Sequence, residues 1–141
     1  MKTQELVSAL LRTADFDGLC ERHADEFMDE NLIGYLLTLM ERHGASKREM
    51  MEQADLEKGY AYQILRGVRK PNRDKLLCIA LGLGCDLQET QTLLKLGGRN
   101  ELYSRVRRDA AIVFCLQRHY SVQRCQTFLA SRHFDTLRDE P

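Results

Sequence analysis

The feature that most constrains this chain is the spacing of its apolar residues, which recur at steps of three and four along almost the whole sequence. Such spacing places apolar side chains on one face of an α-helix, whereas the alternation typical of strands is nearly absent. Only two prolines occur in 141 residues, so few positions oppose a helix. We therefore predict an all-α fold, and we identify no long internal repeat. The expected helices span about 3–13, 19–28, 32–43, 57–66, 73–83, 87–96, 104–118 and 122–132, with a further short helix after Ser46.

Polar residues stand where several of these helices should begin. Ser46 with Glu49, and Asp86 with Glu89, have the spacing of a capping box, in which two free backbone amides are satisfied reciprocally. Further N-caps are expected at Asn31, Asn72 and Ser121. Glycines are expected to end helices at Gly44, Gly67, Gly84 and Gly97–Gly98.

Charge is balanced over the whole chain and uneven along it. Basic and acidic residues number 21 each, so the formal net charge at pH 7 is zero. This excludes a uniformly basic nucleic-acid-binding chain but allows local patches. Residues 1–30 carry a net charge of −5, residues 31–100 carry +3 and residues 101–141 carry +2. The uneven distribution predicts faces with different partners.

These patterns predict three parts. Residues 1–30 form an acidic, helical N-terminal extension. Residues 31–98 form a five-helix core that contains a helix-turn-helix. Residues 99–141 form a C-terminal helical extension that could mediate dimerisation or bind a partner. The tail from Asp135 is polar, and we expect it to fray.

Residues 46–71 combine a helix, a tight turn, a second helix, a glycine stop and a basic loop. Two short helices joined this tightly must cross steeply, which leaves the second helix projecting. Its inward residues are expected to be Ala61 and Ile64, with Leu56 filling the turn. Residues 58–75 hold six basic side chains and one acidic one, and form the densest positive segment of the chain. The outward face of the second helix is expected to carry Lys58, Tyr62, Gln63 and Arg66.

This arrangement suits double-stranded DNA. An α-helix fits the major groove, where each base pair presents a distinct set of donors and acceptors. The amide of Gln63 can bond adenine in two places, and Lys58 can donate to guanine. Arginines at the helix end and in the following loop can neutralise phosphates and set the docking register. Lys47 and Arg48, at the start of the preceding helix, are expected to flank the same DNA backbone, where helical amides add attraction for phosphate.

In these residues the chain resembles the lambda-repressor-like helix-turn-helix domain of the XRE family. The resemblance is carried by residues 47–56, by residues 60–71 with their glycine and proline around a basic loop, and by the L-x-x-I-A-x-x-L pattern of residues 76–83. It covers about half of the chain and implies a five-helix DNA-binding fold. By this resemblance the base-reading residues are Lys58, Gly59, Tyr62 and Gln63. The phosphate contacts are Arg48, Arg66, Lys70 and Arg73, to which the charge pattern adds Lys47 and Arg69.

The resulting hypothesis is a transcriptional regulator of a bacterium or phage that binds specific DNA sequences. A homodimer is favoured because two half-sites about one helical turn apart raise specificity. The helices expected over 104–118 and 122–132 are the best candidates for its interface. Exposure of Val113, Phe114 or Phe128 would strengthen that expectation. Residues 1–30 or 99–141 could also bind a protein partner.

A second hypothesis belongs to another class, a protein-interaction adaptor that keeps the helix-turn-helix scaffold without binding DNA. Glu57 takes a position where Ser or Thr commonly caps the helix, and Gly59 offers no side chain to a base. These residues, the tyrosines beside them and the neutral net charge favour the adaptor. The charge density of residues 58–75 opposes it.

Other classes of function have little support in the sequence. No glycine-rich phosphate loop, H-E-x-x-H or G-x-S-x-G occurs, so we expect neither an enzyme nor a cofactor. The five cysteines form no C-x-x-C and lie apart from the four histidines, so we expect reduced core thiols and no metal. No apolar run reaches the ~20 residues of a membrane span, and no signal peptide is apparent, so we expect a cytoplasmic protein.

Overall fold

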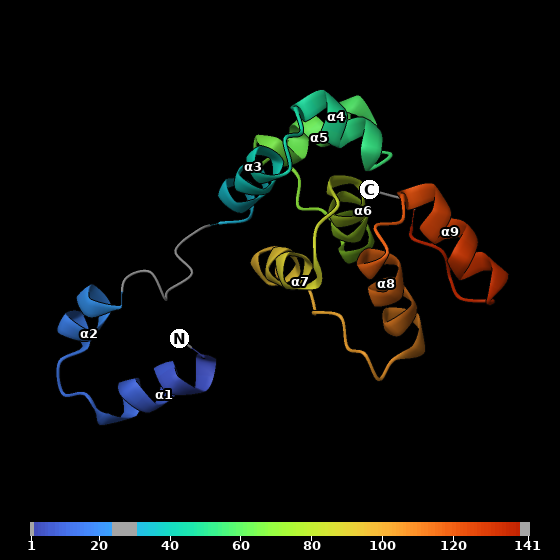
Figure 1. The fold of residues 1–141 in the computed structure, drawn as a ribbon. Coiled ribbons are helices and arrows are strands. Elements are labelled where there is room, and N and C mark those ends of the chain that lie inside the picture. Colours follow the sequence, from blue (N-terminus) through green and yellow to red (C-terminus); the bar gives the residue numbers. More distant parts are fainter. Residues whose placement is uncertain (1, 24–30, 139–141) are drawn as a thin grey trace. The chain divides into compact units, whose positions relative to one another are not determined.

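The computed structural model describes residues 2–23 and 31–138, and these ranges are all-helical, without strands (Figure 1). No helix within them is both long and apolar enough to cross a bilayer. The chain divides into two compact units between residues 30 and 31, and each is described by itself. The first contains α1 (Thr3–Arg12) and α2 (Phe16–Arg22). The second contains α3 (Leu32–Arg42), α4 (Lys47–Gln53), α5 (Lys58–Leu65), α6 (Arg73–Leu83), α7 (Leu87–Leu96), α8 (Arg107–Gln117) and α9 (Val122–Ser131).

The first unit is a pair of short helices that pack on each other. The Asp15 carboxylate accepts a hydrogen bond from the Gly18 amide at 3.1 Å, so α2 begins at Phe16 rather than near residue 19. Leu19 is buried, whereas Phe16 is 62% exposed. The expected end of this helix near residue 28 lies outside the described residues.

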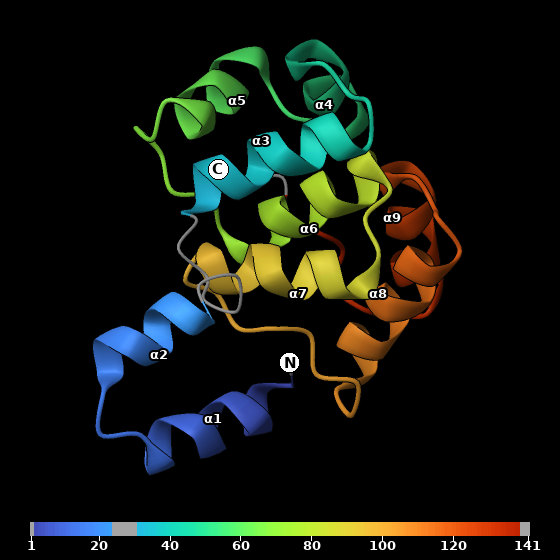
Figure 2. The same ribbon diagram turned by 60° about the vertical axis from the view of Figure 1, so that its left-hand side comes forward.

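The second unit is built around α6, which contacts α4, α7, α8 and α9 (Figures 1 and 2). Residues 76–81 are apolar on every side of the helix, and nine of the eleven residues of α6 are buried. A helix that is apolar all round needs neighbours on every side. Helices α3 to α9 therefore share one hydrophobic core. The boundary expected at residue 98 does not divide this core, because α8 and α9 pack directly on α6.

Side-chain caps begin most of these helices at the positions that the sequence predicts. The two expected capping boxes are present, Ser46 with Glu49 at α4 and Asp86 with Glu89 at α7. The expected N-caps of α3, α6 and α9 are present at Asn31, Asn72 and Ser121. Helix α8 begins at Arg107 rather than near residue 104. The cause is a turn before it, in which the Val106 amide donates to the Tyr103 carbonyl at 2.9 Å.

Two consecutive helical hairpins of the second unit repeat one pattern, so our sequence-based expectation of no long internal repeat was wrong. The first hairpin, residues 73–103, contains α6 and α7, and the second, residues 108–138, contains α8 and α9. Positions 35 apart hold the same residue in Arg73/Arg108, Asp74/Asp109, Leu81/Leu116, Gln88/Gln123, Gln91/Gln126, Thr92/Thr127, Leu94/Leu129 and Leu102/Leu137. Left-handed backbone also falls at matching places, at Gly84 and His119 and at Gly98 and His133.

A glutamine closes each hairpin in the same way. The Gln91 side chain accepts from the Leu102 amide at 2.7 Å and donates to its carbonyl at 2.8 Å. Gln126 makes the same two bonds to Leu137, at 2.7 and 2.9 Å. Leu137 is 2% exposed, so the expectation that the tail frays from Asp135 is wrong for residues 135–138. The Gln126 bonds and the buried leucine hold this segment against the core.

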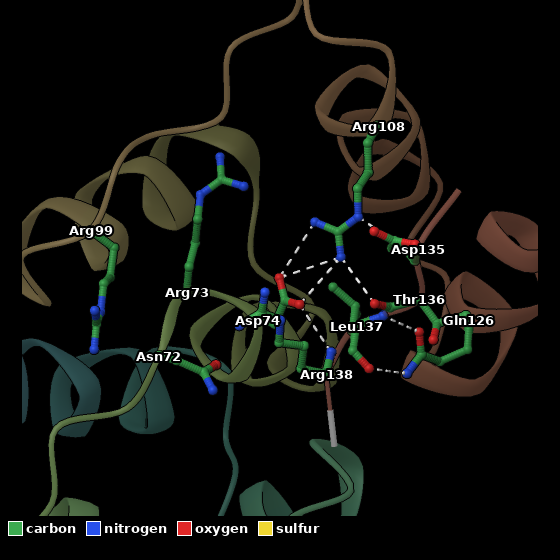
Figure 3. A pocket seen from close by; sticks show the side chains of 10 residues that line it. All are labelled: Asn72, Arg73, Asp74, Arg99, Arg108, Gln126, Asp135, Thr136, Leu137 and Arg138. Atoms are coloured by element: carbon green, nitrogen blue, oxygen red, sulfur yellow. Dashed lines mark hydrogen bonds and ion pairs between the residues drawn. The ribbon is translucent and has the colours of Figure 1, made fainter. Parts of the chain in front are cut away.

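The two hairpins also exchange equivalent ion pairs. Arg73 binds Asp109 with an Nη2–Oδ2 distance of 2.9 Å, and Arg108 binds Asp74 with the corresponding distance of 3.3 Å. Each arginine also donates to two carbonyls that follow the second helix of its own hairpin, Arg73 to Asn100 and Glu101, and Arg108 to Asp135 and Thr136. Figure 3 shows the Arg108 half of this network in the pocket that it lines. Such reciprocal contacts are those of two copies related by a two-fold axis.

Candidate nucleic-acid interface

The helix-turn-helix segment consists of α4, residues 54–57 and α5. Asp55 has left-handed backbone (φ 57°), a conformation that Asp tolerates better than most residues. Ala54 and Leu56, on either side, are 1% and 8% exposed and anchor the turn in the core. The Ala54 amide nitrogen also lies so close to Gly82 of α6 that a Cβ there would come within 2.7 Å of it. These anchors set the direction in which α5 leaves the turn.

Helix α5 has one buried side and one exposed side. Tyr60, Ala61 and Ile64 are 7%, 2% and 1% exposed and face the core, which includes both inward residues expected from the sequence. Nothing lies within 4 Å of the Cβ that Gly59 lacks, so the helix presents bare backbone at that point. The four predicted base-reading residues lie on or beside the exposed side, with Lys58, Gly59 and Tyr62 exposed and Gln63 half-buried.

The basic loop folds back onto the end of α5 through Gln63. The backbone carbonyl of Gln63 accepts from the amides of Val68 and Arg69, at 2.9 and 3.2 Å. Its side-chain oxygen accepts from Arg69 Nε at 2.9 Å. An amide oxygen has two lone pairs, so Gln63 keeps one acceptor site and its NH₂ donors for a base edge. Arg69 therefore orients the residue that we expected to read adenine.

The predicted phosphate contacts divide into two groups. Five of them are exposed, namely Lys47, Arg48, Arg66, Arg69 and Lys70. Arg48 Nε lies 3.1 Å from Glu52 Oε1, but an exposed pair one helical turn apart contributes only ~0.3–0.5 kcal/mol and opens readily. Arg73 differs, because its guanidinium is bound to the buried Asp109 and to two backbone carbonyls. These contacts hold the half-buried Arg73 side chain between the two hairpins, and its guanidinium is bound within the protein rather than free for the predicted phosphate contact.

Arg99 and Tyr60 contact the loop between α5 and α6 and hold it against the rest of the unit. Arg99 donates to the Pro71 carbonyl through Nε and Nη2, at 3.1 and 3.0 Å. The Arg69 guanidinium lies 5.4 Å from the centre of the Tyr60 ring. The Tyr60 hydroxyl is buried without a hydrogen-bond partner among the described residues, and burial raises its pKa. Tyr60 thus supports the loop with its ring, and Lys70 is left exposed at the loop's end.

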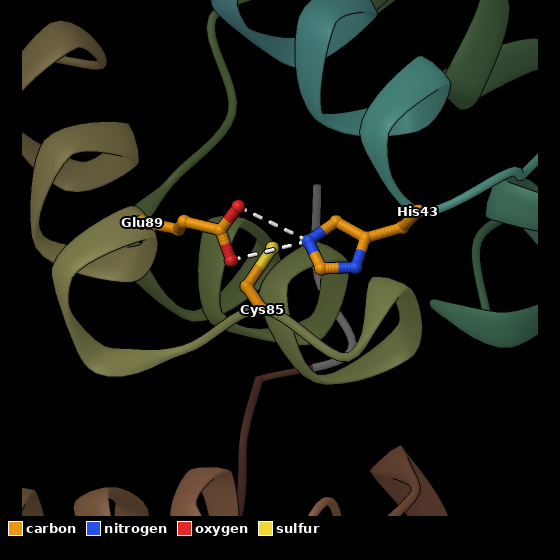
Figure 4. A group of neighbouring side chains, drawn as sticks. All are labelled: His43, Cys85 and Glu89. Carbon is orange, nitrogen blue, oxygen red and sulfur yellow. Dashed lines mark hydrogen bonds and ion pairs between the residues drawn. The ribbon is translucent and has the colours of Figure 1, made fainter.

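One group of potential metal ligands forms only in the fold. Within the described ranges, His43, Cys85 and Glu89 have ligand atoms within 4.8 Å of one another (Figure 4). The Glu89 carboxylate already accepts from Arg42 at 2.8 Å, from the Asp86 amide at 3.0 Å and contacts His43 at 3.1 Å. Burial alone would raise the pKa of Glu89, but these hydrogen bonds outweigh burial and lower it. Burial also raises the pKa of Cys85 to about 12, which keeps the thiol neutral. The arrangement fits a structural role, in which Glu89 of α7 binds Arg42 and His43 at the end of α3.

Comparisons of this chain with protein-family models, with curated proteins and with solved structures find no match. The resemblance of residues 47–83 to the XRE family stays a prediction. The choice between the two functional hypotheses therefore rests on the geometry of α4, α5 and the loop after them.

Proposed function

We propose that this protein is a transcriptional regulator that binds specific DNA sequences. Helix α5 enters the major groove, and the loop of residues 67–71 lies on the phosphate backbone. The observation that carries the proposal is the exposed side of α5, which continues into the basic loop without an acidic residue from Lys58 to Arg73.

Burial separates two kinds of residue along α5. Ala61 and Ile64 are fixed in the core, which holds the helix rigid, while the polar residues between them remain accessible. A rigid helix with accessible polar side chains can read base edges in the major groove. Lys58 donates to guanine acceptors, and Gln63 bonds adenine while Arg69 holds its side chain in place.

The loop supplies charges that set the docking position. Arg66 ends α5, and Arg69 and Lys70 follow within the loop, all exposed. The Arg99 bonds to the Pro71 carbonyl hold the end of this loop. Contacts of this kind position a protein on DNA without reading sequence. Gly59 lets the helix backbone approach a base or sugar closely, because no side chain stands there.

The test is DNA binding by fluorescence anisotropy across a salt series, using random-sequence and genomic fragments. The log of the affinity should fall with log salt at roughly −0.9 per neutralised phosphate. Removal of two contacts in Arg66→Ala/Lys70→Ala should make that slope shallower by about two. Arg105→Ala/Arg107→Ala removes two exposed charges before and at the start of α8 and should leave the slope unchanged.

Failure of the folded parent to bind any fragment at low salt would overturn the proposal. If both double variants made the salt slope shallower by the same amount, binding would depend on overall charge, and docking through α5 and its loop would be rejected. Enrichment of particular genomic fragments would identify the operator. A dimer in solution, measured by light scattering, would fit recognition of two half-sites.

The adaptor function is favoured by one specific observation. Arg73 is withdrawn to Asp109, and exposed Glu52 and Glu57 stand beside the remaining cations. A face of mixed charge suits a protein partner better than a phosphate backbone. Under this alternative, the salt series shows no binding to DNA and the exposed side of α5 is protected from hydrogen exchange only by a protein partner.

A further inference from the structure

The second hairpin presents a compact surface of aromatic and basic side chains. Six residues of α8, α9 and their flanks form what we term the aromatic–arginine surface: Phe114, Tyr120, Phe128, Arg118, Arg124 and Arg132. The rings contact one another, with centroid distances of 5.1 Å for Phe114–Phe128, 6.2 Å for Phe114–Tyr120 and 6.1 Å for Tyr120–Phe128. An arginine lies over each ring, at 3.7 Å for Arg118 on Phe114, 4.0 Å for Arg124 on Tyr120 and 3.7 Å for Arg132 on Phe128.

This surface is accessible and entirely without negative charge. Phe114 is 36% exposed, Tyr120 and Phe128 are half-buried, and the three arginines are exposed. No Asp or Glu occurs from residue 117 to residue 134. An arginine stacked on a ring keeps N–H donors at the edges of its planar group. Of these donors, Nη1 of Arg132 already donates to Ser131 Oγ at 2.9 Å. The surface therefore offers apolar contact together with several donors for carboxylates.

The same face of the first hairpin is already covered. The residues equivalent to the three rings are Ile79, Cys85 and Leu93, and each is 0% exposed. Helix α3 packs on α7, and α4 packs on α6, so two helices of the chain lie on the first hairpin. In the first hairpin, helices of the chain therefore pack on the side that corresponds to the aromatic side of the second hairpin.

The charges of the two faces are opposite at one matching position. In the first hairpin, Glu89 accepts a hydrogen bond from Arg42 of the covering helix α3, at 2.8 Å. The equivalent residue of the second hairpin is Arg124. A helix covering the second hairpin in the same way needs a carboxylate where α3 carries Arg42. At their own matching positions, Arg118 and Arg132 replace Leu83 and Gly97 and add two further cations.

We propose that the aromatic–arginine surface binds an acidic amphipathic helix of a partner protein. Apolar side chains of that helix pack among the rings, and its carboxylates accept hydrogen bonds from Arg118, Arg124 and Arg132. A helix fits better than a nucleic acid because a guanidinium already covers a face of each ring that a base would need for stacking. Binding at this surface does not depend on DNA binding by α5.

The test uses the full chain and two labelled helical peptides, each about 18 residues or five turns long. One has leucine and glutamate at amphipathic spacing, and the other has lysine in place of every glutamate. Fluorescence anisotropy should show that the acidic peptide binds at least about tenfold more tightly than the basic one, as charge complementarity requires. The charge-reversed variant Arg124→Glu/Arg132→Glu should invert this preference.

Two further variants separate the parts of the surface. Arg105→Glu/Arg107→Glu reverses two exposed charges outside the surface and should keep the preference for the acidic peptide. Phe114→Gln removes apolar area without changing the charge, and it should lower the affinity for the acidic peptide severalfold. Circular-dichroism melting of each variant establishes that it is folded.

Three results would overturn the proposal. The first is equal affinity for both peptides, or no saturable binding of the acidic one up to about 1 mM. The second is displacement of the acidic peptide by a DNA duplex, abolished by Arg124→Glu/Arg132→Glu, which would make the surface a nucleic-acid site. The third is a parent dimer that this variant converts to monomer, which would make the surface the homodimer interface that the sequence predicts and that the exposure of Phe114 also fits.

Discussion

The first and second hairpins share a framework and differ in the face that they present. In both, an Arg-Asp pair lies in the first turn of the first helix, and a glutamine of the second helix binds the backbone of a leucine in the closing segment. The first hairpin turns small or aliphatic residues toward α3 and α4, whereas the second carries three aromatic rings under three arginines. Equivalent residues make the ion pairs between the hairpins in both copies, whereas the outer faces differ. The framework thus holds the pair together, and the faces determine what each hairpin binds.

The largest effect is expected from breaking the ion-pair exchange at Asp109. This carboxylate is 6% exposed and accepts from Arg73 and from the Tyr103 amide. Asp109→Ala leaves the arginine charge without its partner and should lower the free energy of unfolding by about 3–5 kcal/mol. Asp74→Ala breaks the matching ion pair, in which the distances between Arg108 and Asp74 are longer. It should therefore lower the free energy of unfolding by less than Asp109→Ala. Urea denaturation of both variants measures the difference.

The equivalence of the two ion pairs can be tested further with Arg73→Ala, Arg108→Ala and the corresponding double variants. Coupling between Arg73 and Asp109 should exceed coupling between Arg108 and Asp74 in double-mutant cycles. Equal coupling would show that the difference of 2.9 Å against 3.3 Å has no energetic meaning.

The dependence of stability on acid pH tests the role of the Asp109 carboxylate separately. Burial alone would raise the pKa of Asp109, but the hydrogen bonds from Arg73 and the Tyr103 amide outweigh burial and lower it. A carboxylate with a lowered folded-state pKa stabilises the fold above its unfolded pKa of about 3.9. That contribution is lost as the pH falls through the folded pKa. The stability of Asp109→Asn should therefore depend less on pH below about pH 4 than that of the parent, and parallel curves would contradict the assignment.

Local signals in the sequence were enough to place most helices. The capping boxes at Ser46 and Asp86 require only residues three positions apart, and both are present. The inward residues Ala61 and Ile64 also follow from helical spacing alone. These features depend on neighbours within one or two turns, which is the range over which a single sequence is informative.

Contacts between distant residues were not predictable in this way. The partner of Arg73 lies 36 positions away, and His43 meets Glu89 across 46 positions, so neither pair has a local signature. Arg73 therefore looked like an available cation in the basic segment. The repeat did leave a readable signal, the shared Q-x-x-Q-T-x-L pattern that begins at Gln88 and at Gln123, with an Arg-Asp pair before each.

A smaller effect is expected from the two glutamine clamps. Gln91→Ala leaves the amide and carbonyl of Leu102 without their partner, and Leu102 is 6% exposed. The loss should be about 1–3 kcal/mol. Gln126→Ala removes the two bonds that hold Leu137, which lies at the end of the described chain. Only the segment around Leu137 should therefore lose stability. Hydrogen exchange should show opening limited to residues 134–138 in the second variant and wider opening in the first.

The smallest effects come from the left-handed residue that ends the first helix of each hairpin, Gly84 (φ 76°) in one and His119 (φ 54°) in the other. Gly84→Ala adds a Cβ with nothing within 4 Å, so only the backbone conformation opposes it. It should lower the free energy of unfolding by about 1 kcal/mol, whereas His119→Gly should raise it by about 0.5 kcal/mol. Thermal melts of the two variants should therefore shift in opposite directions. A shift in the same direction would mean that the exposed His119 side chain stabilises the second hairpin through contacts that glycine in the first hairpin lacks.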